Sequence, residues 1–292
     1  MVDCIILTYS PDEKLLENIS MLRKQTIKPS NIFIINTDEF RFNVDLDLDD
    51  SDEVKLTLVN IKKEDFDHGK TRNMASKLSN EKYILFMTQD AIAVNEKLVE
   101  NLINGFEQYE NVAVVYGRQV PRKGDLIEEF TRKFNYPTYD ILKNKDTKSK
   151  YGIKNIFLSN VCALYDKNIF DKLSGFEENI NFNEDTLYAH KAIENGYSIL
   201  YKADAVVYHT HDYSPRKQYE RNYQIGISHK TNKEVFGEYK TVSEGKTLVV
   251  QTAKYIISSD RSIIEKIKQL FKLVNISMAK YMGFRAGYKS VK

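Results

Sequence analysis

The sequence predicts an α/β protein, in which helices flank a mostly parallel sheet, followed by a helical C-terminal extension. Runs of apolar and β-branched residues, beginning at Val2–Thr8, recur up to about residue 215 and are typical of strands. A helical pattern separates the first two runs, so this unit requires parallel strands with a right-handed crossover. From Ser214 onward the apolar residues recur at helical spacing. We therefore expect two domains, residues 1–215 and residues 216–292.

Composition is typical of an ordinary globular protein. The 292 residues are 42% hydrophobic and 29% charged, and a net charge of +2 gives no global field that would attract nucleic acid. Cys4 and Cys162 fall in apolar runs, which favours buried free thiols in a reducing compartment. The N-terminal residues lack the features of a secretory signal, and no apolar run reaches the roughly 18 residues that span a membrane. These features predict a cytoplasmic protein.

The individual elements follow from periodicity and from end signals. The first helix should begin with Ser10 as N-cap, Pro11 at the first helical position and Glu13 closing a capping box, and end near Gln25. Further strands are predicted at residues 31–36, 55–60, 83–87, 112–116, 156–165, 198–201 and 205–209. Further helices are predicted through residues 75–78 and at residues 96–109, 126–134, 167–173 and 183–196.

Two long segments are predicted to lack regular structure. Residues 38–52 are rich in aspartate, which favours a solvated loop because like charges repel, although alternating apolar residues leave a strand open. Residues 135–154 are rich in lysine, asparagine and aspartate, and we expect a mobile loop region there.

The strand predicted at Tyr83–Met87 has the most informative end. Its five apolar or aromatic residues are typical of a strand buried on both faces, although pattern alone leaves a short buried helix open. Thr88, Gln89 and Asp90 follow it, and ligands of open α/β sheets bind outside the carboxyl ends of the strands. Asp90 is therefore either a helix cap or turn former, or a carboxylate that meets a metal and a phosphate.

Residues 65–73 form a second candidate ligand segment. Arg72 offers a planar fork to phosphate or carboxylate, and Gly69 allows close approach of the backbone to a ligand. The G-x-x-x-x-G-K pattern of a phosphate loop is absent. The alternative is a surface turn in which His68 and Arg72 form an ordinary salt bridge.

Two further clusters combine titratable residues. Glu184 and Asp185 should begin a helix, where the helix dipole alone would stabilise both carboxylates. His209 and His211 end a predicted strand, and the strand period of two places both imidazoles on one side. They are either ligands of a metal or phosphate, or structural residues.

Taken in order, these segments resemble the family 2 inverting glycosyltransferases of the GT-A fold, and among them the bacterial rhamnosyltransferases that use dTDP-L-rhamnose. The resemblance covers about residues 2–215 and implies a Rossmann-like, mostly parallel sheet. It rests on motifs at Ile6–Tyr9, Phe66–Asn73, Phe86–Ala91, Tyr116–Pro121, Ser159–Asn160, Asn183–Asp185 and Val207–Tyr213.

The resemblance implies roles for the matching residues. Asp90 matches the last aspartate of an Asp-x-Asp-like motif that holds a divalent metal, Mg²⁺ or Mn²⁺, on the donor diphosphate, while Thr88 replaces the first aspartate. The missing carboxylate requires another ligand, for which His209 is the first match and His211 the second. Asp185 matches the catalytic base, which takes the proton of the acceptor hydroxyl as inversion occurs.

The remaining matches concern the two substrates. Donor contacts are implied for Thr8, Tyr9, Asp38, His68, Arg72, Asn73, Gln89 and Asp90. Acceptor contacts are implied for Arg118, Asn160 and Glu184. The expected reaction is transfer of L-rhamnose from dTDP-L-rhamnose to a cell-surface polysaccharide or a lipid-linked glycan. The alternatives are another nucleotide sugar of the UDP-hexose type, nucleotidyl transfer, or a non-catalytic glycan-binding partner; formation of a homo-oligomer is left open.

The last predicted helix, within residues 261–292, combines an apolar stripe with many lysines. Such a helix packs on the catalytic domain or on a dimer partner in the ordinary case. Basic amphipathic helices also bind anionic membrane surfaces, which leaves peripheral attachment to the inner face of the membrane open.

Overall fold

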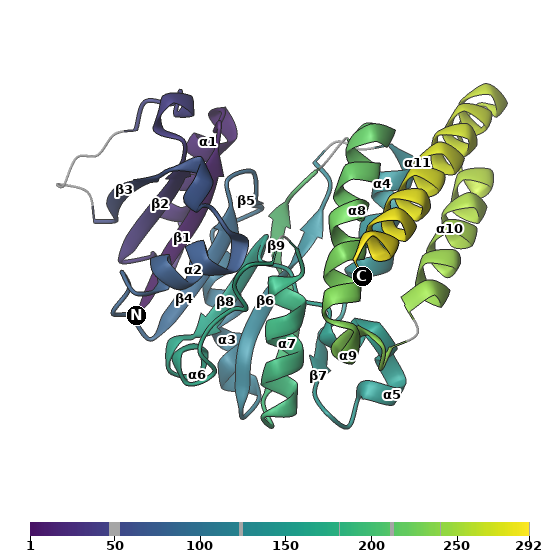
Figure 1. Ribbon diagram of the computed structural model, residues 1–292. Coiled ribbons are helices and arrows are strands. Elements are labelled where there is room, and N and C mark those ends of the chain that lie inside the picture. Colours follow the sequence, from purple (N-terminus) through teal and green to yellow (C-terminus); the bar gives the residue numbers. More distant parts are fainter. Residues whose placement is uncertain (47–52, 123–124, 181, 211–212, 240, 292) are drawn as a thin grey trace. The chain divides into compact units, whose positions relative to one another are not determined.

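The computed structural model describes residues 1–46, 53–122, 125–180, 182–210, 213–239 and 241–291 (Figure 1). The chain divides into two compact units. The first comprises residues 1–119, 138–180 and 184–209, and the second comprises residues 120–137, 181–183 and 210–292.

The first unit is an α/β sheet flanked by helices, as predicted. Among the described residues the strand order is β3-β2-β1-β4-β8-β6-β9-β5, and β7 pairs with β9. The parallel part consists of β3 (Lys55–Ile61), β2 (Asn31–Thr37), β1 (Val2–Tyr9) and β4 (Tyr83–Thr88). Antiparallel pairs join the other strands, which are β5 (Ile92–Ala93), β6 (Val112–Val120), β7 (Ile141–Lys143), β8 (Cys162–Asp166) and β9 (Ser198–Tyr208).

Both faces of the sheet are covered, which explains why its central strands are apolar runs without alternation. One face packs against α1 (Glu13–Arg23) and α3 (Leu98–Gln108). The other carries an aromatic cluster in which ring centroids lie 5.0–6.1 Å apart, formed by Phe86, Tyr165, Phe170, Phe176 and Tyr188. This cluster joins β4 and β8 to α6 (Lys167–Lys172) and α7 (Glu184–Glu194). Cys4 and Cys162 are buried free thiols, as predicted.

The second unit is helical, and it contains the predicted helical C-terminal extension. Its helices are α4 (Leu126–Asn135), α8 (Pro215–Thr231), α9 (Lys233–Phe236), α10 (Thr241–Ser258) and α11 (Ile263–Ser290). Glycines let α8 and α11 approach closely: a Cβ at Gly283 would lie 2.3 Å from the Tyr219 carbonyl oxygen, and one at Gly287 would lie 1.8 Å from that of Tyr223. Among the described helices, none is long and apolar enough to cross a membrane.

Several predicted boundaries are wrong. Asp12, not Ser10, caps α1, and its carboxylate accepts a hydrogen bond from the Lys14 amide, because Ser10 adopts a left-handed φ of 47°. Helix α2 (His68–Ser76) begins earlier than expected, with Asp67 as its N-cap. The two strands predicted at residues 198–201 and 205–209 form the single strand β9.

The prediction of a mobile loop at residues 135–154 is also wrong. This segment contains β7, α5 (Lys148–Tyr151) and the start of a 3₁₀ helix at Gly152–Ile156. Its polar residues bond to the adjoining Asn155: the Asn155 amide donates to the Asn144 carbonyl oxygen at 2.9 Å, and Thr147 Oγ1 donates to Asn155 Oδ1 at 2.8 Å. Amino-acid composition alone does not distinguish polar residues that bond to one another from polar residues that face solvent. In the acidic segment, residues 39–41 form a 3₁₀ turn and residues 47–52 lie outside the described residues.

Candidate active site

Polar side chains gather where the parallel strands end. Thr8 Oγ1 at the end of β1 donates to Asn36 Oδ1 at the end of β2, at 3.2 Å. The Asn36 amide donates in turn to Asn60 Oδ1 on β3, at 2.8 Å. Gln89, just after β4, accepts a hydrogen bond from the Tyr9 backbone N–H at 2.9 Å. Asn36 and Asn60 were missed in the sequence, although each is a polar residue near the carboxyl end of an apolar run.

Tyr9 presents its ring beside positive charge. The residue is 43% exposed, and the Arg41 guanidinium and Lys63 ammonium lie 5.4 Å and 5.7 Å from the ring centroid. Arg41 also pairs with Asp38, whose carboxylate lies 3.3 Å from Arg41 Nε. An exposed aromatic face next to two cations is suited to a planar group that carries negative charge.

Asp90 and His209 come together although they are far apart in the sequence. His209 Nε2 lies 3.5 Å from Asp90 Oδ1. The short antiparallel pairing of β5 with β9 aligns Ile92 with Tyr208 and so brings the residues beside that pair to one place. His209 is buried, whereas the Asp90 side chain is 21% exposed.

Gln119 fixes the orientation of His209. The Gln119 Oε1 oxygen lies 2.8 Å from His209 Nδ1, and its amide nitrogen donates to Ser159 Oγ at 2.9 Å. With a carbonyl oxygen facing it, Nδ1 carries the proton and donates, so the lone pair of the neutral ring lies on Nε2, toward Asp90. Gly117 permits this arrangement, because a Cβ there would lie 2.7 Å from the Ala205 carbonyl oxygen.

The Asp90–His209 pair fits a divalent cation. A carboxylate oxygen and an imidazole lone pair face each other, and the second ring nitrogen is held by a carbonyl, as is usual for metal-binding histidines. Within the described part of the chain no group of three or more His, Cys, Asp or Glu side chains could hold a metal. Two protein ligands suit Mg²⁺ or Mn²⁺, which commonly retain water and substrate phosphate as further ligands.

Glu184 and Asp185 occupy the first turn of α7, as predicted, but in different surroundings. The buried Glu184 carboxylate lies 3.1 Å from Arg72 Nη1 and accepts from the Asn160 amide at 3.2 Å. Asp185 is half-buried, and its carboxylate accepts from the backbone N–H of Thr186 at 2.7 Å and of Asn160 at 3.3 Å.

These surroundings shift the pKa values of Glu184 and Asp185 in opposite directions. Burial raises the pKa of Asp185 to about 7, and the negative charge of Glu184 acts in the same direction. Burial would also raise the pKa of Glu184, but Arg72 and other hydrogen-bonding and charged neighbours outweigh it and lower that pKa. Two adjacent carboxyls with separated pKa values are typical of acid–base sites.

Ser159 and Asn160 connect the two clusters. Ser159 accepts from Gln119, which holds His209, and the Asn160 backbone and side chain bond to Asp185 and Glu184. Asn160 is itself fixed by Tyr165, whose hydroxyl donates to Asn160 Oδ1 at 2.6 Å. One dipeptide before β8 therefore holds both the candidate metal pair and the carboxylate pair.

The other predicted site residues are placed differently. The Asn73 amide donates to the Phe176 carbonyl and to Glu178, so it anchors the segment before α7 instead of facing the strand ends. The His68 ring packs edge-on against Phe66, and its carbonyl accepts from Arg72. Arg118 lies on β6 next to Gln119. His211 lies outside the described residues.

Residues 3–174 match the model of the glycosyl transferase family 2. The chain belongs to this family. It is 32% identical to the O-antigen chain rhamnosyltransferase RfbN of Salmonella typhimurium, over 98% of this chain and 89% of that protein. It is 31% identical to the O-antigen chain rhamnosyltransferase WbaN of Salmonella anatum, over 91% of this chain and 82% of that protein. The chain is therefore a glycosyltransferase, and the family predicted from its motifs is confirmed.

Solved structures share the fold. A mannosyltransferase from Pyrobaculum calidifontis, solved with GDP-mannose and Mn²⁺, aligns with a TM-score of 0.57 and 12% identity, over 99% of this chain and 84% of its own. Residues 1–349 of Staphylococcus aureus TarS align with a TM-score of 0.53 and 16% identity, over 95% of this chain and 72% of its own. These likenesses confirm the predicted GT-A fold.

Proposed function

We propose that the chain is an inverting, metal-dependent transferase that moves L-rhamnose from dTDP-L-rhamnose to a cell-surface polysaccharide or a lipid-linked glycan. One observation carries the proposal. Asp185 is half-buried and its pKa is raised to about 7, and the Ser159–Asn160 dipeptide ties it to the Asp90–His209 pair.

Asp185 is the general base of the proposed reaction. A base with a pKa near the working pH takes up a proton readily and is still ionised in a large fraction of molecules. Asp185 would remove the proton of the acceptor hydroxyl while that oxygen attacks the anomeric carbon. Glu184 is the weaker base, because Arg72 and Asn160 both contact its Oε1 and its pKa is lowered. Among the described residues, no second carboxylate without an ion-pair partner adjoins Asp185 in α7, which favours a single displacement that inverts the anomeric configuration.

The donor would lie along the ends of the parallel strands. Tyr9, with Arg41 and Lys63 beside it, offers a stacking surface and positive charge for a nucleotide. Asp90 and His209 would hold a divalent cation, which neutralises the charge that develops on the leaving diphosphate. Such a cation accompanies GDP-mannose in the structure of the Pyrobaculum mannosyltransferase.

The sugar and the acceptor are inferred from the relatives. The two Salmonella proteins are named as O-antigen chain rhamnosyltransferases and match nearly the whole chain, which supports rhamnose as the sugar and a polysaccharide as the product. A donor of the UDP-hexose type is the second candidate, since a TarS structure of the same fold was solved with UDP-GlcNAc.

A panel of nucleotide sugars tests this proposal. Purified protein is incubated with dTDP-L-rhamnose, UDP-hexoses or GDP-mannose, with Mn²⁺ or with a chelator, and released nucleoside diphosphate is measured. We expect the largest release from dTDP-L-rhamnose, only with metal, and little release by Asp90→Asn. Preference for another sugar would contradict the donor, metal-independent release would contradict the cofactor, and no release from any donor would favour a non-catalytic role.

A further inference from the structure

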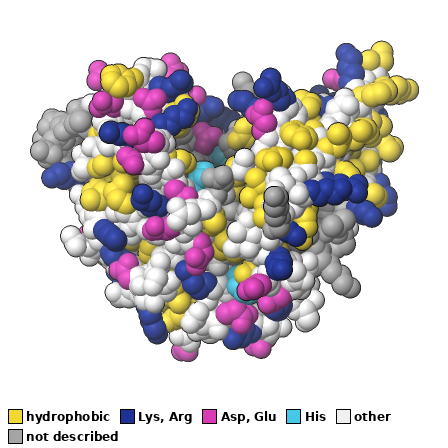
Figure 2. Space-filling model, in the orientation of Figure 1, with side chains coloured by type: hydrophobic (Ala, Val, Ile, Leu, Met, Phe, Trp, Pro, Cys, Tyr) yellow, Lys and Arg dark blue, Asp and Glu magenta, His cyan; other side chains and the backbone are white. Residues whose placement is uncertain are grey.

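Helix α11 has two apolar faces, but only one of them is covered. On the inner face, Leu273, Ile276, Gly283 and Gly287 are buried. On the outer face, apolar side chains are each between 49% and 76% exposed, and they are Ile263, Ile264, Ile267, Phe271, Val274, Met278, Tyr281 and Met282. We call these eight residues the outer stripe. Figure 2 shows apolar side chains gathered along α11 with Lys and Arg side chains beside them.

The outer stripe is narrow and continuous. At about 100° per residue its eight members fall within an arc of about 100°, and the 19 steps from the first member to the last, at about 1.5 Å each, extend over roughly 28 Å. Soluble monomers rarely expose a contiguous apolar patch of this extent unless it binds something.

The charged residues of α11 are almost all basic. Its basic residues are Lys266, Lys268, Lys272, Lys280, Arg285 and Lys289, and its single acidic residue is Glu265. Lys272 pairs with Asp125 at 2.6 Å within the second unit. Lys268, Arg285 and Lys289 are exposed along the same side of the helix as the outer stripe.

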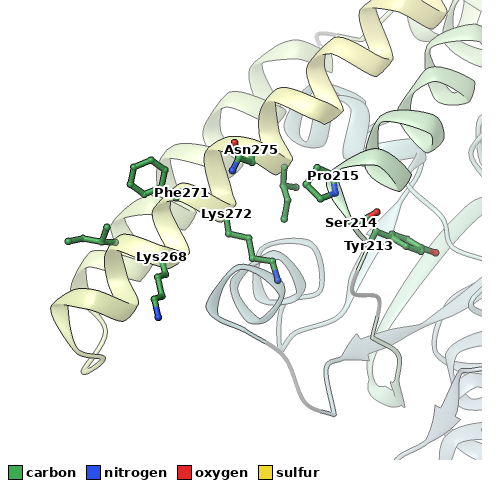
Figure 3. Close-up of a pocket in the computed structure, with 9 residues that line it drawn as sticks. Tyr213, Ser214, Pro215, Lys268, Phe271, Lys272 and Asn275 are labelled. Carbon is green, nitrogen blue, oxygen red and sulfur yellow. The ribbon is translucent and has the colours of Figure 1, made fainter.

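A groove of about 510 Å³ adjoins the outer stripe (Figure 3). It runs between the start of α8, at Ser214 and Pro215, and α11. Ile267 and Phe271 belong to both the groove and the outer stripe. Lys268, which also lines the groove, extends from α11. Apolar walls that end at lysine side chains match a surface with an apolar interior and an anionic outer layer.

We propose that the outer stripe of α11 docks on an anionic lipid surface. The apolar side chains would enter the boundary of the acyl chains while Lys268, Arg285 and Lys289 meet the lipid phosphates. A second copy of α11 would fit the spacing of the stripe, since residues 264, 267, 271, 274, 278 and 281 alternate in steps of three and four. It would not fit the charge, because no acidic residue flanks that seam to face the lysines. The proposal does not depend on the identity of the donor.

Co-sedimentation with vesicles tests the docking. Full-length protein is mixed with phosphatidylcholine vesicles, with and without phosphatidylglycerol. We expect binding to the anionic vesicles to be at least about tenfold tighter, since each cation near such a surface contributes about fivefold. Phe271→Ser combined with Tyr281→Ser should weaken binding by about tenfold or more while the circular dichroism spectrum is unchanged, because both side chains are exposed.

Matched controls separate docking from general stickiness. Phe40→Ser combined with Tyr139→Ser removes the same residue types at positions that are 89% and 65% exposed outside α11, and should leave vesicle binding unchanged. Lys268→Gln combined with Lys289→Gln should weaken binding to anionic vesicles by about thirtyfold. Lys24→Gln combined with Lys77→Gln changes the net charge equally and should have no effect.

Two results would overturn the proposal. One is wild-type protein that stays in the supernatant with both kinds of vesicle. The other is a dimer, seen by light scattering, that Phe271→Ser with Tyr281→Ser converts to monomer, because the outer stripe would then be covered by a second copy. If those serine variants do not fold, the lysine variants alone decide.

Discussion

At the scale of single residues, the environment of Asp185 matters more than its residue type. Asp185 and Glu184 are neighbours in the first turn of one helix, but Arg72 forms its ion pair with Glu184 and has a smaller effect on Asp185 than burial and Glu184 have. Arg72 keeps Glu184 ionised, and the ionised Glu184 then helps burial to hold back ionisation of Asp185. Arg72 therefore has two effects on the pKa of Asp185: it lowers that pKa directly, and it raises it indirectly by keeping Glu184 ionised.

The raised pKa of Asp185 predicts a pH-dependent effect of Asp185→Asn on stability. An unfolded aspartate titrates at about 4, so between about pH 4 and pH 7 the folded protein binds more protons and loses stability as pH rises. The Asp185→Asn variant does not lose stability in this way, because asparagine does not titrate. The melting temperature of the variant minus that of wild type should therefore rise with pH through this window and level off above it.

Thermal melts at a series of pH values check this prediction. The hydrogen bond from the Asn160 N–H that asparagine perturbs adds a nearly constant offset, which does not affect the slope. A melting-temperature difference that is independent of pH would mean that Asp185 titrates normally.

Gln119 is predicted to control metal affinity without touching the metal. Gln119→Leu keeps the approximate size of the side chain but removes the acceptor for His209 Nδ1, so the imidazole loses its fixed tautomer and orientation. Loss of such a supporting contact typically costs about 10–100-fold in metal affinity. Calorimetric titration of Mn²⁺ in the presence of dTDP measures the metal affinity of Gln119→Leu. Gln108→Leu, at the exposed end of α3, is the control. Equal Mn²⁺ affinity in both variants would show that Gln119 does not position His209.

At the scale of elements, the contact of α8 with α11 depends on glycine. In Gly287→Ala the added Cβ would lie 1.8 Å from the Tyr223 carbonyl oxygen, which forces the helices apart, so we expect a loss of about 1–3 kcal/mol. At Gly245 in α10, nothing lies within 4 Å of an added Cβ. Gly245→Ala should therefore stabilise by about 0.5–1 kcal/mol through helix propensity. Thermal unfolding measures the stability of both variants. Changes of the same sign would contradict the close packing of α8 against α11.

The elements that the sequence predicts well are those whose signal is local. The central strands β1, β2 and β4 are buried on both faces, so each appears as an apolar run close to its true bounds. The sequence predicts that the helical part begins at Ser214, and the structure has Ser214 as the N-cap of α8. The position of the candidate donor site follows from these runs, because parallel strands present their carboxyl ends together.

What the sequence does not predict depends on contacts between distant segments. Nothing local distinguishes Gln119 from any polar residue on a strand, and its role exists only because His209 lies beside it. Lys143 falls in the segment predicted to be a mobile loop, yet it is buried and donates to the Phe157 carbonyl at 2.7 Å. Asn73 matched a donor-binding motif, but its amide bonds to the Phe176 backbone. In each case the partner lies at least 14 residues away in the sequence.

At the scale of the whole molecule, the two units carry different parts of the proposed activity. Every described residue of the candidate site belongs to the first unit, whose sheet brings the strand ends together. The outer stripe and the adjoining groove belong to the second unit. The chain thus separates the chemistry of transfer from the proposed contact with a lipid surface, and variants of α11 should leave release of nucleoside diphosphate from soluble donor unchanged.

The pH dependence of turnover tests the central claim, that Asp185 is the base, most directly. Release of dTDP from dTDP-L-rhamnose is measured with Mn²⁺ between pH 5 and pH 9 for wild type and Asp185→Asn. In wild type, kcat/KM should fall about tenfold per pH unit below about 7, where Asp185 becomes protonated. Asp185→Asn should bind the donor normally, turn over about 10²–10⁴-fold more slowly and lose this pH limb. A variant that keeps both the limb near pH 7 and wild-type turnover would contradict the assignment of Asp185 as the base.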